Sequence, residues 1–441
     1  MSPSRTFFVQ NFGCRASQAD GAALEASLAS EGLAAVPSAD QAALVVLNTC
    51  TVTSSADQDV RQIIRRLRRQ NPAVEIAVTG CYAQRASEEL AQIDGVRFVI
   101  GNSHKGQLAQ IVAHAPSSYH APSTYHAQVH VNDIFAQEDF FLAPVEGPAG
   151  DRARPNLKIQ DGCNNRCSFC IIPSVRGKSR SAPADWVLRE TQRLADAGYQ
   201  EVVLTGINLG RWGREWGQGR QFTDLLARLL AETTIPLLRL SSVEPMDWTP
   251  ELLELMAGSP RLAQHIHMPL QSGSDAVLRR MHRKYRPRHY QDRIERARAL
   301  MPHAALGADV MTGFPGETDA EFAESLAFIE ALPFTYLHVF TYSERPGTKA
   351  VDLPGAVPVE VRRERNRILQ EVSERKNLVF RRSQSGRRVP AVTLGGSTAL
   401  STNYLRIELA QPRPANQLIE LPLGQVTPRG LAEATLLSVL R

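Results

Sequence analysis

Three cysteines stand within eight residues of one another, at Cys163, Cys167 and Cys170, in the stretch KIQDGCNNRCSFCIIP. Thiolates at this spacing, on a loop that contains Gly and Asn, can converge on one face of a metal cluster. A zinc site ordinarily takes four ligands, and no fourth Cys or His lies nearby in the sequence. The spacing therefore indicates an iron–sulfur cluster with three protein ligands and one iron open to a substrate or cofactor.

The other three cysteines, Cys14, Cys50 and Cys81, share one setting. Each ends an apolar, strand-like run (RTFFVQNFGC, ALVVLNTC and VEIAVTGC), and a helical pattern follows each run. Ligands of such βα repeats gather beyond the carboxyl ends of the parallel strands, so the three thiols are expected to meet at one edge. A single buried cysteine is usually inert packing. Three at equivalent strand ends favour a second set of metal ligands.

The Cys163–Cys170 loop resembles the signature of the radical S-adenosylmethionine (SAM) superfamily, with the aromatic Phe169 directly before the last cysteine. The resemblance implies a [4Fe-4S] cluster whose open iron chelates the amino and carboxylate groups of SAM. It also implies that an electron from the cluster cleaves SAM to methionine and a 5′-deoxyadenosyl radical.

Two tri-cysteine sets in this order resemble the methylthiotransferases over nearly the whole chain, through VLNTCTVT, VTGCYAQ, DGCNNRCSFCIIP, PLQSGSD, MTGFPGET and FTYSERPGTKA. VLNTCTVT, VTGCYAQ and RGKSRS are most similar to the MtaB type, which modifies N6-threonylcarbamoyladenosine beside the tRNA anticodon. The resemblance implies that Cys14, Cys50 and Cys81 hold a second [4Fe-4S] cluster that carries the sulfur to be inserted. One SAM would donate the methyl group and another would supply the radical.

The partners implied by this resemblance are the anticodon arm of tRNA, an electron-donating reductase or flavodoxin-like protein, and a sulfur donor. The MiaB type, acting on isopentenyladenosine, and the RimO type, acting on a ribosomal-protein aspartate, share the cysteines and stay open as alternatives. An iron–sulfur RNA-binding regulator without turnover is an alternative of another class, although its three-ligand sites argue against it. Two positions depart from the family pattern: Ser17 stands where Asn is usual, and Ala308 where Thr is common.

The chain has 441 residues, 43% of them hydrophobic and 22% charged, which is an ordinary globular balance. It contains no apolar run long enough to span a bilayer, and its first residues lack the pattern of a signal peptide. We therefore expect a soluble, cytoplasmic protein without a membrane contact.

The elements that position the cysteines predict an α/β protein. Residues 1–112 form four βα units, and 113–153, rich in Ala, Pro, Ser and His, form a linker or surface excursion rather than a metal-binding tract. Residues 154–350 form a partial (βα)6 barrel with its chemistry at the carboxyl ends of the strands. The strands are expected near 157–161, 201–206, 237–242, 264–270, 306–312 and 336–342. The helices are expected near 185–197, 222–232, 249–257, 274–281, 289–301 and 318–331.

Turns at these strand ends supply candidate SAM contacts. Gly206 and Asn208 follow the second barrel strand, Gln271 and Ser272 the fourth, and Gly313 the fifth. Glycines there allow close approach of the backbone to a ligand, although each turn could equally be ordinary loop punctuation.

The end of the chain changes character. Residues 351–388 are expected to form a basic helical connector, and 389–441 resemble a TRAM domain, a small β-barrel that contacts RNA. Four short strands are expected there, near 389–394, 403–409, 417–421 and 432–439. The net charge of the chain is +5, and segment 360–388, with ten basic and four acidic residues, carries +6 of charge by itself. This segment predicts a contact with the phosphate backbone of RNA. The alternative is a solvated helix whose charges form ion pairs at i,i+3 and i,i+4.

Overall fold

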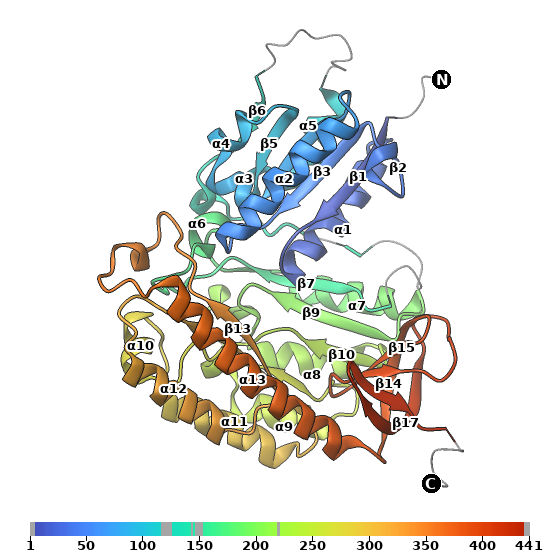
Figure 1. Ribbon diagram of the computed structural model, residues 1–441. Coiled ribbons are helices and arrows are strands. Elements are labelled where there is room, and N and C mark those ends of the chain that lie inside the picture. Colours follow the sequence, from blue (N-terminus) through green and yellow to red (C-terminus); the bar gives the residue numbers. More distant parts are fainter. Residues whose placement is uncertain (1–4, 116–125, 143, 146–152, 218–220, 436–441) are drawn as a thin grey trace.

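A computed structural model describes residues 5–115, 126–142, 144–145, 153–217 and 221–435 of the chain. They form an N-terminal α/β domain, a central α/β domain and a small C-terminal β-barrel, in chain order (Figure 1). The helices in this part of the chain include none that is long and apolar enough to cross a membrane.

The N-terminal domain is built on six parallel strands in the order β2-β1-β3-β4-β5-β6. They are β1 (Thr6–Asn11), β2 (Ala34–Ala35), β3 (Leu44–Thr49), β4 (Glu75–Gly80), β5 (Val96–Gly101) and β6 (Gln128–His130). Every residue of β3 is buried, as in a parallel sheet covered on both faces. Because β1, β3 and β4 are neighbours, the loops that carry Cys14, Cys50 and Cys81 leave the sheet at the same edge.

The helices of this domain are α1 (Arg15–Ser30), α2 (Ser54–Gln70), α3 (Cys81–Arg85), α4 (Ser87–Ala91) and α5 (Leu108–His114). The sequence predicts a single helix over 83–92, whereas the structure has two short ones. Ala86, between them, has φ −137° and ψ 52°, outside the helical region, and this backbone conformation separates α3 from α4. Cys81 is the first residue of α3, so its backbone position is fixed by both β4 and the helix.

The segment 113–153, which the sequence predicts as a linker, contributes the edge strand β6 to the N-terminal sheet. Three residues are too few to produce a recognisable strand pattern. Of the histidines in this segment, His114 ends α5, His126 precedes β6 and His130 lies in it, while His120 lies outside the described residues. His130 is near only one other histidine ring, that of His104, at 6.2 Å between centroids.

The central domain contains the six predicted parallel strands: β7 (Asn156–Asp161), β9 (Glu201–Gly206), β10 (Leu237–Leu240), β11 (His265–His267), β12 (Ala305–Thr312) and β13 (Tyr336–Thr341). They pair as β10-β9-β7, with the short antiparallel β8 (Arg180–Ser181) at the edge, and as β11-β12-β13. Backbone hydrogen bonds between Leu238 and residues 261 and 263 join the two sheets. The strands therefore form an open, partial barrel with β13 at one edge.

The predicted barrel helices are all present: α7 (Ala184–Asp196), α8 (Phe222–Glu232), α9 (Pro250–Gly258), α10 (Asp275–Arg280), α11 (Pro287–Leu300) and α12 (Asp319–Ala331). Local signals set their starts. Thr318 caps α12 through a reciprocal capping box with Glu321, and Thr249 caps α9 ahead of Pro250. The short α6 (Ile172–Arg176) follows the Cys163–Cys170 loop directly.

The long helix α13 (Val359–Gln384) packs along β13 and α12 at the open edge of the barrel (Figure 1). Several of its cations are engaged in ion pairs: Arg365 with Glu317, Arg367 with Glu371 and Arg375 with Glu330. Part of the basic segment is therefore a helix with ion pairs. Among the described residues, ion pairs are absent from five other arginines of the segment: Arg363, Arg381, Arg382, Arg387 and Arg388.

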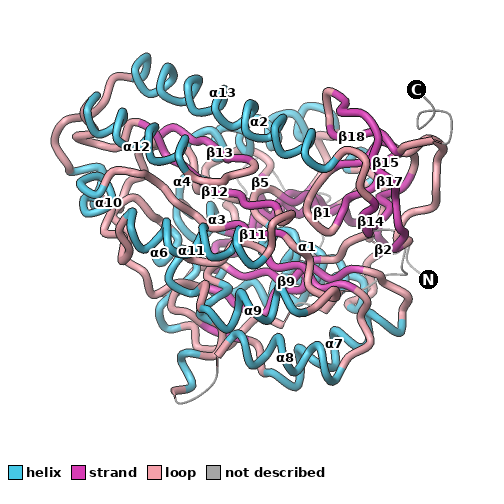
Figure 2. Tube along the Cα trace, turned by 90° about the horizontal axis from the view of Figure 1, so that it is seen from below, coloured by secondary structure: helices cyan, strands magenta, loops and turns pink. Residues whose placement is uncertain are grey.

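The C-terminal domain is a closed barrel of β14 (Arg388–Gly395), β15 (Thr398–Ser401), β16 (Arg406–Glu408), β17 (Leu418–Thr427) and β18 (Gly430–Glu433). The sequence predicts four strands here and misses β15, which a Gly395–Gly396 turn separates from β14. Its last expected strand, 432–439, begins earlier in the structure, and residues 436–441 lie outside the described part. Arg239 of β10 donates hydrogen bonds to the carbonyls of Ser401 and Thr402, so this barrel rests against the central domain (Figure 2).

Candidate active site

The loops of the first cysteine set touch one another. Cys14 is the N-cap residue of α1, Cys50 follows β3, and Cys81 opens α3. A Cβ built on Gly13 would lie 3.0 Å from Cys50 Sγ, and Gly13 adopts a φ of +93°, so this close approach requires glycine. The three strand ends therefore bring the three thiols together, as the sequence predicts.

The three thiols of this set differ in exposure, because Cys14 is exposed whereas Cys50 and Cys81 are buried. Burial, together with the neighbouring Cys81 and Cys14, raises the pKa of the Cys50 thiol to about 12. Cys81 Sγ accepts a hydrogen bond from Asn102 Nδ2 at 3.6 Å. The Cys50 thiol holds its proton unless a cation is bound, so it is suited to ligation rather than to reaction with solvent.

The second set lies on the loop between β7 and α6, and its three thiols are half-buried. Cys163 Sγ accepts hydrogen bonds from the backbone N–H of Asn165 at 3.4 Å and from Asn208 Nδ2 at 3.6 Å. Cys167 Sγ accepts one from Arg283 Nη1 at 3.2 Å. Burial and the neighbouring Cys167 raise the pKa of Cys170 to about 12. Directed N–H groups and one guanidinium thus surround this loop, as they would a negatively charged cluster.

The number of donors in each set differs from that of a closed zinc site. Such a site takes four protein ligands, whereas each cysteine set supplies three thiols. Three thiolates on a four-iron cluster would leave one iron open to a further ligand.

The contact between α3 and α6 links the loops of the two sets. Cys81 packs in one buried apolar cluster with Ile171, the residue after Cys170, and with Val175. Asn102 ties the same elements together, because its Nδ2 donates to both Cys81 Sγ and the carbonyl of Val175. A molecule bound at one set is therefore close to the other.

A buried charge network joins the two domains beside the cysteines. Asp20 of α1 forms ion pairs with Lys105, with Lys158 of β7 and with Arg176 of α6, and Arg176 also binds Asp161. All five side chains are at least nine-tenths buried. Arg176 Nη2 in addition donates to Ser17 Oγ at 3.1 Å, which lies 3.7 Å from Cys14 Sγ.

Comparison with known proteins accounts for both cysteine sets. Residues 6–101 match the family described as "Uncharacterized protein family UPF0004", and residues 157–329 match the radical SAM superfamily. The chain is 34% identical over 416 residues to the threonylcarbamoyladenosine tRNA methylthiotransferase MtaB of Aquifex aeolicus, covering 93% of this chain and 98% of that one. The chain belongs to the methylthiotransferase family of radical SAM enzymes.

Other methylthiotransferases are similar at comparable levels. The MtaB protein of Bacillus subtilis is 40% identical over 322 residues, covering 73% of this chain and 69% of that one. A tRNA-2-methylthio-N(6)-dimethylallyladenosine synthase of Syntrophobacter fumaroxidans is 33% identical over 437 residues, covering 96% and 92%. As a member of this family the protein is an enzyme, which sets aside the regulator without turnover, and it uses SAM and a [4Fe-4S] cluster.

Among solved structures, the radical SAM methyltransferase TsrM of Kitasatospora setae has the same fold. It superposes with a TM-score of 0.55 at 17% identity, covering 79% of this chain and 77% of that one. The cobalamin-dependent radical SAM enzyme OxsB superposes with a TM-score of 0.51 at 12% identity, covering 85% and 56%. The methylthiotransferase chain thus shares its architecture with radical SAM enzymes of very different sequence.

The predicted SAM contacts of this methylthiotransferase fall into two groups. Asn208 reaches Cys163 Sγ, and Gly206 packs against Gln160, where a Cβ would lie 2.9 Å from the Gln160 Cβ. Gln271, with φ +67°, pairs through its backbone with β12, and the Ser272 hydroxyl accepts from a backbone N–H two residues on. Gly313 packs on Arg362 of α13. Asn208 thus contacts the cysteine loop directly, and the other four stay predicted SAM contacts.

Sequence reasoning missed the residues that surround the sulfur atoms. Arg283, which contacts Cys167 and also forms an ion pair with Glu244, lies far from the cysteine loop in sequence. Asn102 and Arg176 come from a turn and a short helix without a chemical pattern of their own. Only the hydrogen bonds of the folded chain identify them, because each acts through a contact between separate elements.

Proposed function

We propose that this enzyme transfers a methylthio group to C2 of N6-threonylcarbamoyladenosine next to the anticodon of tRNA. The observation that carries the proposal is the presence of two three-thiol sets, linked by the packing of Cys81 on Ile171, in a chain of the methylthiotransferase family. The substrate assignment is supported by the names of the relatives at 34% and 40% identity. It is also supported by the resemblance of VLNTCTVT, VTGCYAQ and RGKSRS to the MtaB type.

In this proposal Cys163, Cys167 and Cys170 hold the cluster that binds SAM. A second [4Fe-4S] cluster is held by Cys14, Cys50 and Cys81. When bound, the two clusters supply an electron for SAM cleavage and the sulfur that is inserted. Such chemistry suits adenine C2, whose C–H bond has neither a leaving group nor an easily removed proton, so that acid–base catalysis cannot functionalise it.

The chain's own residues hold and insulate these groups. Arg283 and Asn208 direct N–H groups at the sulfur atoms of one set, and Asn102 does so at the other. Cys81 packs with Ile171 and Val175 in a buried apolar cluster, so water is excluded from this part of the contact between α3 and α6.

An open cleft of about 660 Å³ lies between the N-terminal end of α2 and the end of β13. Its lining includes Ser54, Ser343 and Arg363, and the loop on the α2 side begins at Cys50. Arg363 forms no ion pair within the described chain, so its charge is available to a phosphate. The cleft is therefore a suitable entrance for a tRNA base. In this proposal the enzyme works in the cytoplasm, together with an electron-donating protein and a sulfur donor.

The MiaB-type substrate, isopentenyladenosine, is the second candidate, because relatives with that activity in their names reach 33–35% identity. Mass spectrometry of nucleosides from the tRNA of a deletion strain tests the choice. We expect loss of the 2-methylthio derivative of N6-threonylcarbamoyladenosine and retention of the unmethylthiolated nucleoside. Loss of the isopentenyl derivative instead would assign the MiaB-type activity, and intact tRNA nucleosides would move the substrate to a protein of the RimO type.

A further inference from the structure

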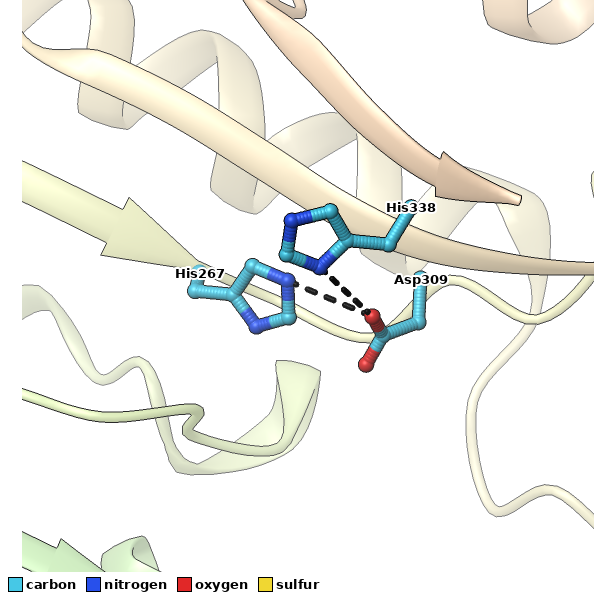
Figure 3. Close-up of side chains that lie close together, drawn as sticks. All are labelled: His267, Asp309 and His338. Atoms are coloured by element: carbon cyan, nitrogen blue, oxygen red, sulfur yellow. Dashed lines mark ion pairs between the residues drawn. The ribbon is translucent and has the colours of Figure 1, made fainter. Parts of the chain in front are cut away.

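Three polar side chains that take no part in either cysteine set converge in the central barrel. His267 ends β11, Asp309 lies in β12 and His338 in β13, and one ligand atom from each lies within 4.8 Å of the others (Figure 3). Asp309 Oδ1 is 3.4 Å from His267 Nε2 and 3.4 Å from His338 Nδ1. We propose that these residues bind one divalent first-row transition-metal ion.

The strand register puts the three side chains on one face. Asp309 is paired directly with His338, and His267 is paired with Gly307, two residues before Asp309. The alternate residues of the same strands, Ile266, Leu306, Ala308, Val310, Leu337 and Val339, pack in the apolar core. Since successive side chains of a strand point to opposite faces, the His267–Asp309–His338 group faces the barrel interior.

His267 is already oriented as metal-bound histidines are. Its Nδ1 lies 2.6 Å from Ser242 Oγ, while its Nε2 is buried and has no hydrogen-bond partner in the described structure. The side chain is only 7% exposed. A histidine that ligates a metal ordinarily uses its other ring nitrogen in a hydrogen bond of this kind, which fixes the tautomer and the ring orientation.

In one tautomer of His267, two acceptor atoms face each other, and a cation between them would satisfy both. If Nδ1 donates its proton to Ser242 Oγ, the lone pair of Nε2 is directed at the Asp309 carboxylate, which is itself an acceptor. Two facing acceptors repel each other unless a positive ion lies between them. A metal at ~2.1 Å from each of two ligands in tetrahedral geometry would separate those ligands by roughly 3.4 Å. Both measured N–O distances have this value.

The donor set indicates the class of ion. Two imidazole nitrogens and one carboxylate suit Zn²⁺, Fe²⁺ or Mn²⁺, whereas Mg²⁺ and Ca²⁺ favour all-oxygen sites. Three protein ligands leave at least one coordination position open, as in sites that bind a further molecule. Ser242 is also two residues from Glu244, which forms the ion pair with Arg283 beside Cys167, so the group lies on the wall that supports the Cys163–Cys170 loop.

Binding of Mn²⁺ to the holoenzyme tests the proposal. Mn²⁺ prefers nitrogen and oxygen ligands to thiolates, so it discriminates against the cysteine sets. The full chain with reconstituted clusters in their oxidised state is freed of loosely held metal by gel filtration with a chelator. It is then titrated with Mn²⁺, and free Mn²⁺ is counted from its electron paramagnetic resonance signal. We expect one saturable site per chain.

Asp309→Asn and His338→Asn should each weaken Mn²⁺ binding at least tenfold. Ser242→Ala should weaken it about tenfold, through the orientation of His267. His338 is half-exposed, so its substitution leaves the core packing intact, and circular dichroism checks the fold. His114→Gln, at the exposed end of α5, is the matched control and should bind like the wild type. The absence of a saturable site would overturn the proposal, and so would wild-type affinity in the Asp309→Asn and His338→Asn variants.

Discussion

Arg345 Nη2 donates a hydrogen bond of 2.7 Å to Thr51 Oγ1, which is 294 residues away in sequence. The same guanidinium forms an ion pair with Asp57 of α2, and Arg85 binds both Thr51 and Asp57 from the other side. Thr51 directly follows Cys50. Arg345, from the SERPGT stretch after β13, therefore clamps the Cys50 loop to the central domain.

Replacing Arg345 by Ala should loosen this clamp. The change leaves the buried Asp57 carboxylate with one cation in place of two, and the loss of a partner from a buried pair costs roughly 3 kcal/mol. We expect a melting temperature lower by several degrees and faster proteolysis at the junction between the domains. Arg228→Ala, at a solvent-exposed ion pair with Glu232, is the control and should leave both unchanged. Equal melting temperatures for the two variants would contradict the clamp.

The buried network around Asp20 should make the domain contact sensitive to acid. Burial alone would raise the pKa of Asp20, but Lys105, Lys158 and Arg176 hold it well below its usual range. A carboxyl whose pKa is lowered by folding stabilises the protein above its unfolded pKa, at about 3.9. This stability is lost as the pH falls below about 4 toward the folded value.

Asp20→Asn should therefore lower the free energy of unfolding at pH 7 by roughly 3–5 kcal/mol, because three buried cations lose their shared counter-charge. Between pH 7 and pH 3.5 the variant should lose less stability than the wild type, since it no longer has this carboxylate to protonate. Urea unfolding at the two pH values measures both effects. Parallel losses in the two proteins would show that Asp20 is not the acid-sensitive group.

Most of the architecture could be predicted from the sequence because its signals are local. The apolar runs before Cys14, Cys50 and Cys81 mark strands, and the alternation of strands and helices after Leu157 predicts the partial barrel. The structure adds what local patterns do not contain. The break at Ala86 and the edge strand β6 depend on tertiary packing over very few residues.

Of the candidate site, only the six cysteines could be predicted from the sequence, and the residues that contact them could not. Cysteine spacing is a property of the sequence, whereas the contact of Arg283 with Cys167 joins residues 116 positions apart. The His267–Asp309–His338 group depends on the register of three strands, and no spacing in the sequence marks it. The sequence alone does not decide whether segment 360–388 contacts RNA or forms internal ion pairs, for a related reason. The elements that pack against α13 determine which of its arginines form ion pairs.

Iron analysis should distinguish two clusters from one. Because the six cysteines form two sets of three, anaerobic reconstitution should give about eight iron atoms per chain, at about four per cluster. Changing Cys163, Cys167 and Cys170 together to Ala should leave about four, and so should the triple change of Cys14, Cys50 and Cys81. A wild-type chain that never exceeds one cluster's worth of iron would refute the second cluster.

The two sets should have separable roles. Cys50→Ala should retain reductive cleavage of SAM to methionine and 5′-deoxyadenosine yet form no methylthio product, because only the sulfur-carrying set is damaged. Cys167→Ala should lose both activities, since the SAM-binding set is damaged. Chromatography of the nucleoside products measures the two together. Equal loss of SAM cleavage in the two variants would contradict this division.

The arginines at the end of α13 should supply much of the salt-dependent tRNA affinity. Arg381, Arg382, Arg387 and Arg388 form no ion pair in the described structure, in contrast to Arg365, Arg367 and Arg375 of the same segment. Replacing the four by Gln should flatten the slope of log affinity against log salt by about three units if each contacts a phosphate. The effect should be similar for cognate and non-cognate tRNA, since phosphate contacts do not read bases.

The control is a variant that loses the same number of positive charges from another surface. Arg65, Arg66, Arg68 and Arg69 of α2 line an open pocket of the N-terminal domain, and their replacement by Gln also removes four positive charges. If α13 carries the contact, this second variant should keep most of the wild-type slope, and both variants should still cleave SAM. If instead the α2 variant flattens the slope and the α13 variant does not, the phosphate backbone lies on the N-terminal domain. Fluorescence anisotropy titrations between 50 mM and 200 mM salt would resolve the two cases, because three units of slope over that range change the affinity by roughly sixtyfold.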